Sequence, residues 1–231
     1  ADLHSSPKRQ FINFMVKYIK KMVPSVSFPR QINYRKALSL GKKKQLKEVQ
    51  NQKISDQMEK IAVLQYTGGT TGLAKGAMLS HSNLIANMRQ FKDRLHGENP
   101  CAGDVMVAPL PLYHIYSFTI NMVYAIHMGM NNVLITNPRD IPAFVSALKP
   151  HRFAIFVGLN TLYNALCANK EFCKLDFSAL KVCSSGGMAL SSKTYQRWLK
   201  VTGCKILEGY GLTETSPLVS CNSTANFQEG T

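Results

Sequence analysis

Hydroxyl, glycine and lysine residues are concentrated between residues 66 and 76, which read YTGGTTGLAKG. The glycines permit tight backbone conformations that bring N–H groups close to a ligand, and the threonines offer hydroxyl donors. Lys75 adds a mobile positive charge for outer phosphate oxygens. Although the spacing fits neither G-x-x-x-x-G-K-[ST] nor G-x-G-x-x-G, we predict a polyphosphate loop here. The alternative is an ordinary glycine turn with exposed threonines.

A second motif, EGYGLTET, occupies residues 208–215. Its glycines leave the backbone around Tyr210 open, so that the ring could stack on a base. Thr213 offers a hydroxyl and Glu214 a hard oxygen ligand, and Mg²⁺ favours one or two carboxylates together with substrate phosphates. The alternative is a Thr-Glu pair that only caps a helix.

Two further motifs carry a weaker signal. SSGGM, residues 184–188, places a glycine pair where a flat ring could lie against the backbone. PLPLYHIYS, residues 109–117, brings His114 just beyond a predicted strand. A lone histidine is more often structural than catalytic, but the position of His114 just after a strand favours a direct role in a ligand site.

Strand and helix patterns alternate from residue 61 onward, which predicts an α/β fold with a largely parallel sheet and right-handed crossovers. In such sheets ligands bind beyond the carboxyl ends of the strands, where all four motifs would project, so we expect one shared crevice. The predicted strands are 61–66, 104–110, 131–136, 152–158, 180–187 and 204–211. The predicted helices are 82–95, 115–129, 140–149, 161–169 and 191–203.

Residues 1–60 form a basic N-terminal segment, distinct from the α/β region of residues 61–231, and they hold 14 of the 28 Lys and Arg residues but only 4 of the 13 acidic ones. Within residues 11–23, apolar side chains recur at helical spacing opposite lysines, so this amphipathic helix could lie on an anionic membrane. The alternative is a surface helix packed on its own domain. Residues 41–59 are polar and lysine-rich, and we expect an exposed loop or linker.

The net charge of +15 suggests an anionic partner or only a solvated basic face. We predict no nucleic acid partner, because the basic segment lacks interleaved aromatic residues and any nucleic-acid-binding motif. The six cysteines form no C-x-x-C pair, and the chain shows no signal peptide and no apolar run of about 18 residues. This indicates a cytoplasmic protein with reduced thiols, with peripheral contact at the inner membrane surface as an option.

The four motifs stand in the order typical of the adenylate-forming superfamily, which the chain resembles: acyl-CoA synthetases, peptide-synthetase adenylation domains and luciferases. More narrowly, FMVKYIK (14–20), LITNPRDIP (134–142) and NKEFCKLDFSALK (169–181) look like bacterial long-chain fatty-acid–CoA ligases. The resemblance runs from about Phe11 to Asn222. It implies that a fatty carboxylate attacks the α-phosphate of ATP to give acyl-adenylate and pyrophosphate, and that coenzyme A then displaces AMP, with Mg²⁺ as metal cofactor.

The resemblance also implies roles for individual residues. The loop from Thr67 to Lys75 would hold the outer phosphates, Tyr210 would stack on adenine beside the glycine pair, and Thr213 would contact the α-phosphate. The implied catalytic residues are Lys75, His114, Thr213 and Glu214, with Glu214 and Thr70 at the metal. The implied nucleotide-binding residues are Tyr66, Thr67, Gly68, Gly69, Thr70, Thr71, Gly72, Lys75, Gly186, Gly187, Met188, Tyr210, Gly211 and Thr213. The implied fatty-acid contacts are Tyr113, His114, Phe118, Val157, Gly158 and Leu159.

The chain departs from the family pattern at Gly68 and Ala189, where many relatives have serine and proline. It also stops soon after GYGLTE, so we expect an incomplete large domain that lacks the mobile C-terminal domain. Two other interpretations stay open: a noncatalytic nucleotide- or membrane-binding protein, and an adenylate-forming enzyme for an aromatic or amino acid. An incomplete sheet would expose its edges, which favours association between copies.

Overall fold

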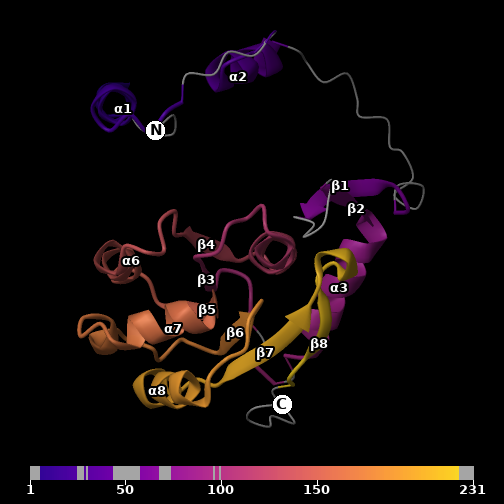
Figure 1. The fold of residues 1–231 in the computed structure, drawn as a ribbon, viewed down its shortest axis with the longest axis vertical. Coiled ribbons are helices and arrows are strands. Elements are labelled where there is room, and N and C mark those ends of the chain that lie inside the picture. Colours follow the sequence, from indigo (N-terminus) through magenta and orange to yellow (C-terminus); the bar gives the residue numbers. More distant parts are fainter. Residues whose placement is uncertain are drawn as a thin grey trace. The chain divides into compact units, whose positions relative to one another are not determined.

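The computed structural model describes residues 6–24, 29, 31–43, 58–67, 74–95, 97–98 and 100–223, which fall into two units, Ala1–Gln52 and Lys53–Thr231. The first unit contains helix α1 (Ser6–Phe14), the π-helix η1 (Met15–Ile19) and helix α2 (Tyr34–Lys43) (Figure 1). The helix predicted within residues 11–23 is thus present, and it begins earlier, at Ser6. Residues 41–43, predicted as the start of a loop, belong to α2, and residues 44–57 lie outside the described part.

The second unit is built on a six-stranded sheet with the order β4-β3-β5-β6-β7-β8. The first five strands in this order run parallel, and β8 pairs antiparallel with β7. The strands are β3 (Val105–Ala108), β4 (Asn131–Leu134), β5 (Phe153–Gly158), β6 (Val182–Gly186), β7 (Ile206–Gly211) and β8 (Leu218–Cys221). The prediction of a largely parallel sheet from residue 104 onward is confirmed.

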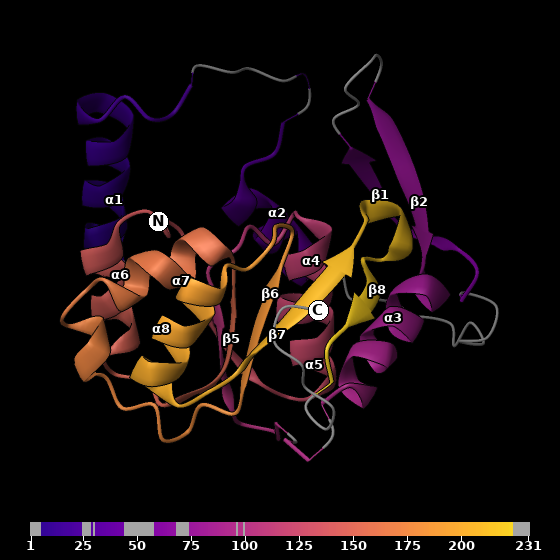
Figure 2. The same ribbon diagram turned by 60° about the horizontal axis from the view of Figure 1, so that its bottom comes forward.

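Helices cover both faces of this sheet (Figure 2). Along β5, Ile155 and Val157 pack toward α3 and η3, whereas Phe156 packs toward α7 and α8 beside the buried ring of Trp198. This period-2 alternation between two apolar layers is why the central strands read as continuous hydrophobic runs. One face carries α3 (His81–Asp93), α4 (Ile115–Ser117), η3 (Phe118–Tyr124) and α5 (Ala125–His127). The other carries α6 (Ile141–Leu148), α7 (Asn160–Cys167), η4 (Phe172–Lys174) and α8 (Ser192–Thr202).

The first predicted strand differs from expectation. β1 (Ile61–Thr67) pairs antiparallel with β2 (Lys75–Ser80) in a separate hairpin, and Leu64 is 55% exposed. The prediction of a buried strand in the parallel sheet was therefore wrong. The physical reason is that residues 75–80, for which no strand was predicted, form β2, and the short connection between β1 and β2 lets them pair as an antiparallel hairpin. Strand β8 was not predicted, because four residues after a glycine-rich turn carry little pattern.

Candidate active site

A cavity of about 520 Å³ lies at the carboxyl ends of β6 and β7. Its walls come from the end of β1, the turn after β3, the ends of β6 and β7, and the segment that leads into β8. The expectation of one shared crevice is confirmed in its geometry. The cavity brings together eight residues singled out from the sequence: Thr67, His114, Gly186, Gly187, Tyr210, Gly211, Thr213 and Glu214.

Close backbone packing shapes the glycine-lined wall. Gly186 and Gly209 are register partners, and a Cβ atom on Gly186 would lie 3.2 Å from the Gly209 carbonyl oxygen. Gly187 has a φ of +78°, a conformation that favours glycine. A Cβ atom on Gly211 would overlap the Pro217 carbonyl group, with only 2.8 Å to its carbon. Larger residues at 186 and 211 would therefore displace the strand ends that form this wall.

The turn that carries Thr213 and Glu214 is the 3₁₀-helix η5 (Thr213–Thr215). It is held by local hydrogen bonds, because the Leu212 N–H donates to the Pro217 carbonyl at 2.9 Å and to the Thr215 hydroxyl at 3.1 Å. The Thr215 hydroxyl also lies within donating reach of the Leu212 and Pro217 carbonyls. Glu214 thus presents an exposed carboxylate at the cavity wall.

The carboxylate of Glu214 suits Mg²⁺ that is held mainly by substrate and water. In the described part of the chain, no three His, Cys, Asp or Glu side chains gather into a cage for a metal ion. Mg²⁺ is usually bound through one or two carboxylates plus phosphate oxygens, so the single carboxylate of Glu214 fits this ion when a phosphate-bearing ligand supplies the other oxygens. Thr70, the second predicted ligand, lies outside the described residues.

His114 stands at the start of α4, where its Nδ1 accepts the backbone N–H of Tyr116 at 3.2 Å. Because Nδ1 is the acceptor, the proton of the neutral imidazole resides on Nε2. The preceding residue, Tyr113, is 79% exposed, and its carbonyl accepts the side-chain amide of Gln65 at 3.0 Å. This bond ties the turn after β3 to the hairpin that carries Thr67.

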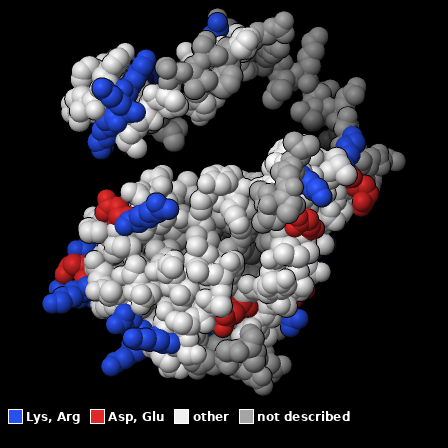
Figure 3. Space-filling model, in the orientation of Figure 1, with Lys and Arg blue, Asp and Glu red and all other residues white. Residues whose placement is uncertain are grey.

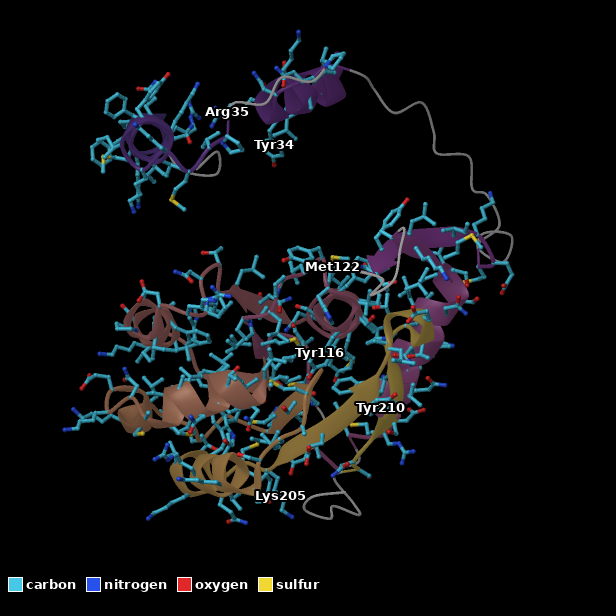
Figure 4. All side chains as sticks on the ribbon, viewed as in Figure 1. Tyr34, Arg35, Tyr116, Met122, Lys205 and Tyr210 are labelled. Carbon is cyan, nitrogen blue, oxygen red and sulfur yellow. The ribbon has the colours of Figure 1, made fainter. Side chains whose placement is uncertain are left out.

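The inner half of the cavity is apolar and was missed by sequence reasoning. Figure 4 shows Tyr116 in the middle of the second unit and Tyr210 on β7. The Tyr116 hydroxyl and the Ser184 hydroxyl lie 2.6 Å apart, and burial raises the pKa of Tyr116 well above its usual value, partly offset by this hydrogen bond. Burial also raises the pKa of Cys221 to about 11, so this end is uncharged near neutral pH. The apolar lining residues include Phe91, Ile115, Ile120 and Leu218.

Other predicted nucleotide contacts lie outside this cavity or outside the described residues. Tyr66 is 66% exposed and lies over Gly76 across the hairpin, and Lys75 is exposed at the start of β2. Met188 lines a neighbouring pocket of about 420 Å³, which it shares with Tyr210 and Glu208. Gly68, Gly69, Thr70, Thr71 and Gly72 fall in the part of the loop that the structure does not describe.

None of the five apolar fatty-acid contacts proposed from the sequence lines the 520 Å³ cavity. Val157 is fully buried in the core, and a Cβ atom on Gly158 would lie 3.0 Å from the Tyr163 ring. Phe118 packs in the small cluster under the hairpin, and Leu159 lies near Gly187. Their positions were inferred from strand ends alone, whereas the apolar lining comes mainly from the helices α3, α4 and η3 and from β8.

Comparison with known proteins adds to this geometry. Residues 16–231 match a protein family described as AMP-binding enzyme. The long-chain-fatty-acid–CoA ligase of Haemophilus influenzae is 46% identical over 223 residues, which cover 95% of this chain and 39% of the relative. That of Salmonella typhimurium is 47% identical over 222 residues, which cover 96% of this chain and 39% of the relative. The chain therefore spans about two fifths of the length of these curated relatives.

The fold also matches solved structures. The crystal structure of the anthranilate CoA ligase AuaEII in complex with anthranoyl-AMP superposes with a TM-score of 0.67 at 25% identity. The match covers 75% of this chain and 33% of that one.

Proposed function

Since this chain belongs to the family of AMP-binding enzymes, we propose that it is the part of a long-chain fatty-acid–CoA ligase that binds ATP and the fatty acid. The observation that carries the proposal is that one 520 Å³ cavity is lined both by polar groups at the strand ends and by buried apolar side chains. Such a cavity can hold a charged reacting centre next to a hydrocarbon tail. The names of the two curated relatives described above support the same substrate class.

In the proposed first step, the fatty carboxylate attacks the α-phosphate of ATP and pyrophosphate leaves. Nucleotidyl transfer of this kind depends mainly on positioning and on neutralisation of charge. The Thr213 hydroxyl and the Nε2–H of His114, both from residues that line the cavity, would donate hydrogen bonds to the reacting oxygens, and Lys75 would neutralise the outer phosphates. Glu214 would hold Mg²⁺, which supplies positive charge against the phosphate oxygens.

We place the acyl tail in the inner half of the cavity. Phe91, Ile120 and Leu218 give this half an apolar surface, and its thiol and phenol groups stay neutral because burial raises their pKa values. A hydrocarbon chain gains by leaving water for such a surface, at roughly 0.8 kcal/mol for each buried CH₂ group. In the second step, coenzyme A would displace AMP from the acyl-adenylate.

We also propose that α1 and η1 contact an anionic lipid surface, with the protein in the cytoplasm at the inner face of the membrane. Residues 6–24 carry five basic residues and no acidic one, and Figure 3 shows Lys and Arg side chains on this segment. Phe11 is 65%, Tyr18 60% and Met22 69% exposed. Apolar and basic side chains on one short helix are typical of peripheral binding. In the described residues, no helix is long and apolar enough to span a bilayer.

Vesicle sedimentation tests this contact. We expect the chain to sediment with vesicles that contain phosphatidylserine and to stay in solution with neutral phosphatidylcholine vesicles. A variant with Lys20→Glu and Lys21→Glu should lose binding, and one with Lys149→Glu, at the C-cap of α6, should keep it. Equal sedimentation of both variants with anionic vesicles would contradict the proposal.

Self-association is a further proposal, based on the open edges of the sheet. The edge strands are β4 and β8. At β8 the N–H and carbonyl of Leu218 are bonded by Asn87, so the proposal concerns the edge of β4, where Leu134 is 57% exposed. Unpaired strand edges of this kind favour pairing between copies. Light scattering over a range of protein concentrations tests this, and a constant monomer mass would contradict it.

Fatty-acid-dependent exchange of labelled pyrophosphate into ATP tests the proposed function. We expect exchange with a long-chain acid, a strong loss in the Lys75→Ala variant, and little change in the Lys60→Ala variant, which removes an exposed lysine next to the same hairpin. Exchange that needs anthranilate or an amino acid would instead support an adenylate-forming enzyme for another acid. Nucleotide binding without exchange under any acid would support the noncatalytic interpretation.

A further inference from the structure

A buried amide lies on the otherwise apolar face of α3. Asn87 is 4% exposed and shares this face with Leu84, Met88 and Phe91. A buried amide is costly unless its hydrogen bonds are made, so its partners show what it does. Its Nδ2 donates to the Leu218 carbonyl at 2.8 Å, and its Oδ1 accepts the Leu218 N–H at 2.9 Å. Asn87 therefore pairs with one backbone residue in the way that a neighbouring strand would.

A second buried side chain holds the same segment from another helix. Thr119, on η3, is fully buried and donates its hydroxyl to the Ser216 carbonyl at 3.1 Å. The Asn87–Leu218 contact joins residues that are 131 positions apart in the chain, and the Thr119–Ser216 contact joins residues that are 97 positions apart. Figures 1 and 2 both show α3 alongside β8. Residues 216–218 are thus fixed from α3 and from η3, between the turn of Thr213 and the edge strand.

The segment fixed in this way supports the polar wall of the cavity. The Pro217 carbonyl accepts the Leu212 N–H at 2.9 Å and lies directly against Gly211. Pro217 and Leu218 line the cavity, whereas Asn87 and Thr119 do not. A shift of residues 216–218 would therefore move Gly211 and Leu212, and with them the turn that presents Thr213 and Glu214.

We propose that Asn87 and Thr119 are positioning residues for the nucleotide end of the cavity, acting through the backbone of Ser216–Leu218. The inference rests on the proposed function, because it takes ATP as the ligand of the Thr213–Glu214 turn. Neither side chain touches that ligand. Each holds the segment against which the turn is folded, so its loss weakens nucleotide binding by more than the change in stability explains.

Two readouts on the unaltered chain and its variants test this proposal. Hydrogen–deuterium exchange over residues 209–221 reports the backbone of the segment, and fluorescence titration with trinitrophenyl-ATP reports nucleotide binding. We expect Asn87→Ala to speed hydrogen–deuterium exchange there and to weaken trinitrophenyl-ATP binding by about tenfold, because the N–H and carbonyl of Leu218 lose their buried partner and the segment can shift. The matched control is Gln90→Ala on the same helix, which removes the exposed partner of the Asn87 amide.

Two substitutions of Thr119 keep the proposal testable in case the Asn87→Ala variant does not fold. Thr119→Val keeps the shape and removes the hydroxyl, whereas Thr119→Ser keeps the hydroxyl and removes a methyl group. Positioning predicts weaker binding in Thr119→Val and near-normal binding in Thr119→Ser, while a packing role predicts the reverse. Unchanged affinity in folded Asn87→Ala or Thr119→Val would overturn the inference alone. No trinitrophenyl-ATP binding by the unaltered chain would overturn the proposed function and this inference with it.

Discussion

Gly211 offers a sharp test of how the polar wall is built. In the Gly211→Ala variant, the new Cβ atom would lie 2.8 Å from the Pro217 carbonyl carbon and 3.3 Å from the Leu218 Cα atom. Carbon atoms pack at about 3.5–4.0 Å, so the two backbone segments must separate by roughly 0.7 Å or more. Both contacts are to backbone, and neither can be relieved by rotation of a side chain.

This separation displaces the start of the turn that carries Thr213. Misplacement approaching 1 Å costs up to about 100-fold in rate, so we expect pyrophosphate exchange to fall by roughly 10- to 100-fold. Overpacking typically costs about 1–3 kcal/mol, which should lower the Tm of the second unit by several degrees. Thermal unfolding followed by circular dichroism and the exchange assay measure the two effects.

The matched comparison is Gly209→Ala, two residues earlier on β7. Its new Cβ atom would lie 3.2 Å from Leu218 Cδ1, the end of a flexible side chain that can move aside. We therefore expect a smaller loss of both exchange and stability. A Gly209→Ala variant that is impaired as much as Gly211→Ala, or a fully active Gly211→Ala variant, would refute the reasoning from backbone overlap.

Two further predictions concern buried or paired polar groups. Tyr116→Phe leaves the buried Ser184 hydroxyl without its 2.6 Å partner and should cost about 1–2 kcal/mol in urea unfolding, whereas adding Ser184→Ala should cost less than the sum of the single changes. Burial alone would raise the pKa of Asp104, but hydrogen bonds from Lys181 and a backbone N–H bring this pKa below its usual value of 3.8. The ionised carboxylate therefore adds to the stability of the fold above about pH 4, and this stabilisation is lost as the pH falls through the lowered pKa. Lys181→Ala should therefore cost up to about 1 kcal/mol at pH 7 and less near pH 2, and an equal cost at both pH values would contradict this.

The sequence predicted the parallel core well, because its strands are continuous apolar runs separated by helices with a clear apolar face. It failed at Ile61–Thr67, where a short apolar run shows that a strand forms but not which strand it pairs with. The deciding fact was a second strand at Lys75–Ser80, which lies close enough in the sequence to pair with Ile61–Thr67 as an antiparallel hairpin. The edge strand Leu218–Cys221 is too short for its pattern to be recognised.

The candidate site was predictable where its residues follow strands. Gly186, Gly187 and Tyr210 stand in glycine-rich turns at the carboxyl ends of the sheet, and topology alone brings such turns together. Phe91 and Ile120 lie on helices, and which face of a helix reaches a cavity depends on packing that the sequence does not specify. One signal was present and unused, since Asn87 is an amide on an otherwise apolar helix face.

The two ends of the cavity share one short piece of backbone, and this limits how either end can vary. The Leu218 side chain lines the apolar half, while its N–H and carbonyl are both taken by Asn87. The adjacent Pro217 carbonyl holds Leu212, which leads into the turn of Thr213. A change that enlarges the apolar half by moving the Leu218 backbone must therefore also move the polar turn, whereas a change of the Phe91 or Ile120 side chain need not. Substitution of the helix residues Phe91 and Ile120 can thus change the size of the cavity without displacing its polar wall.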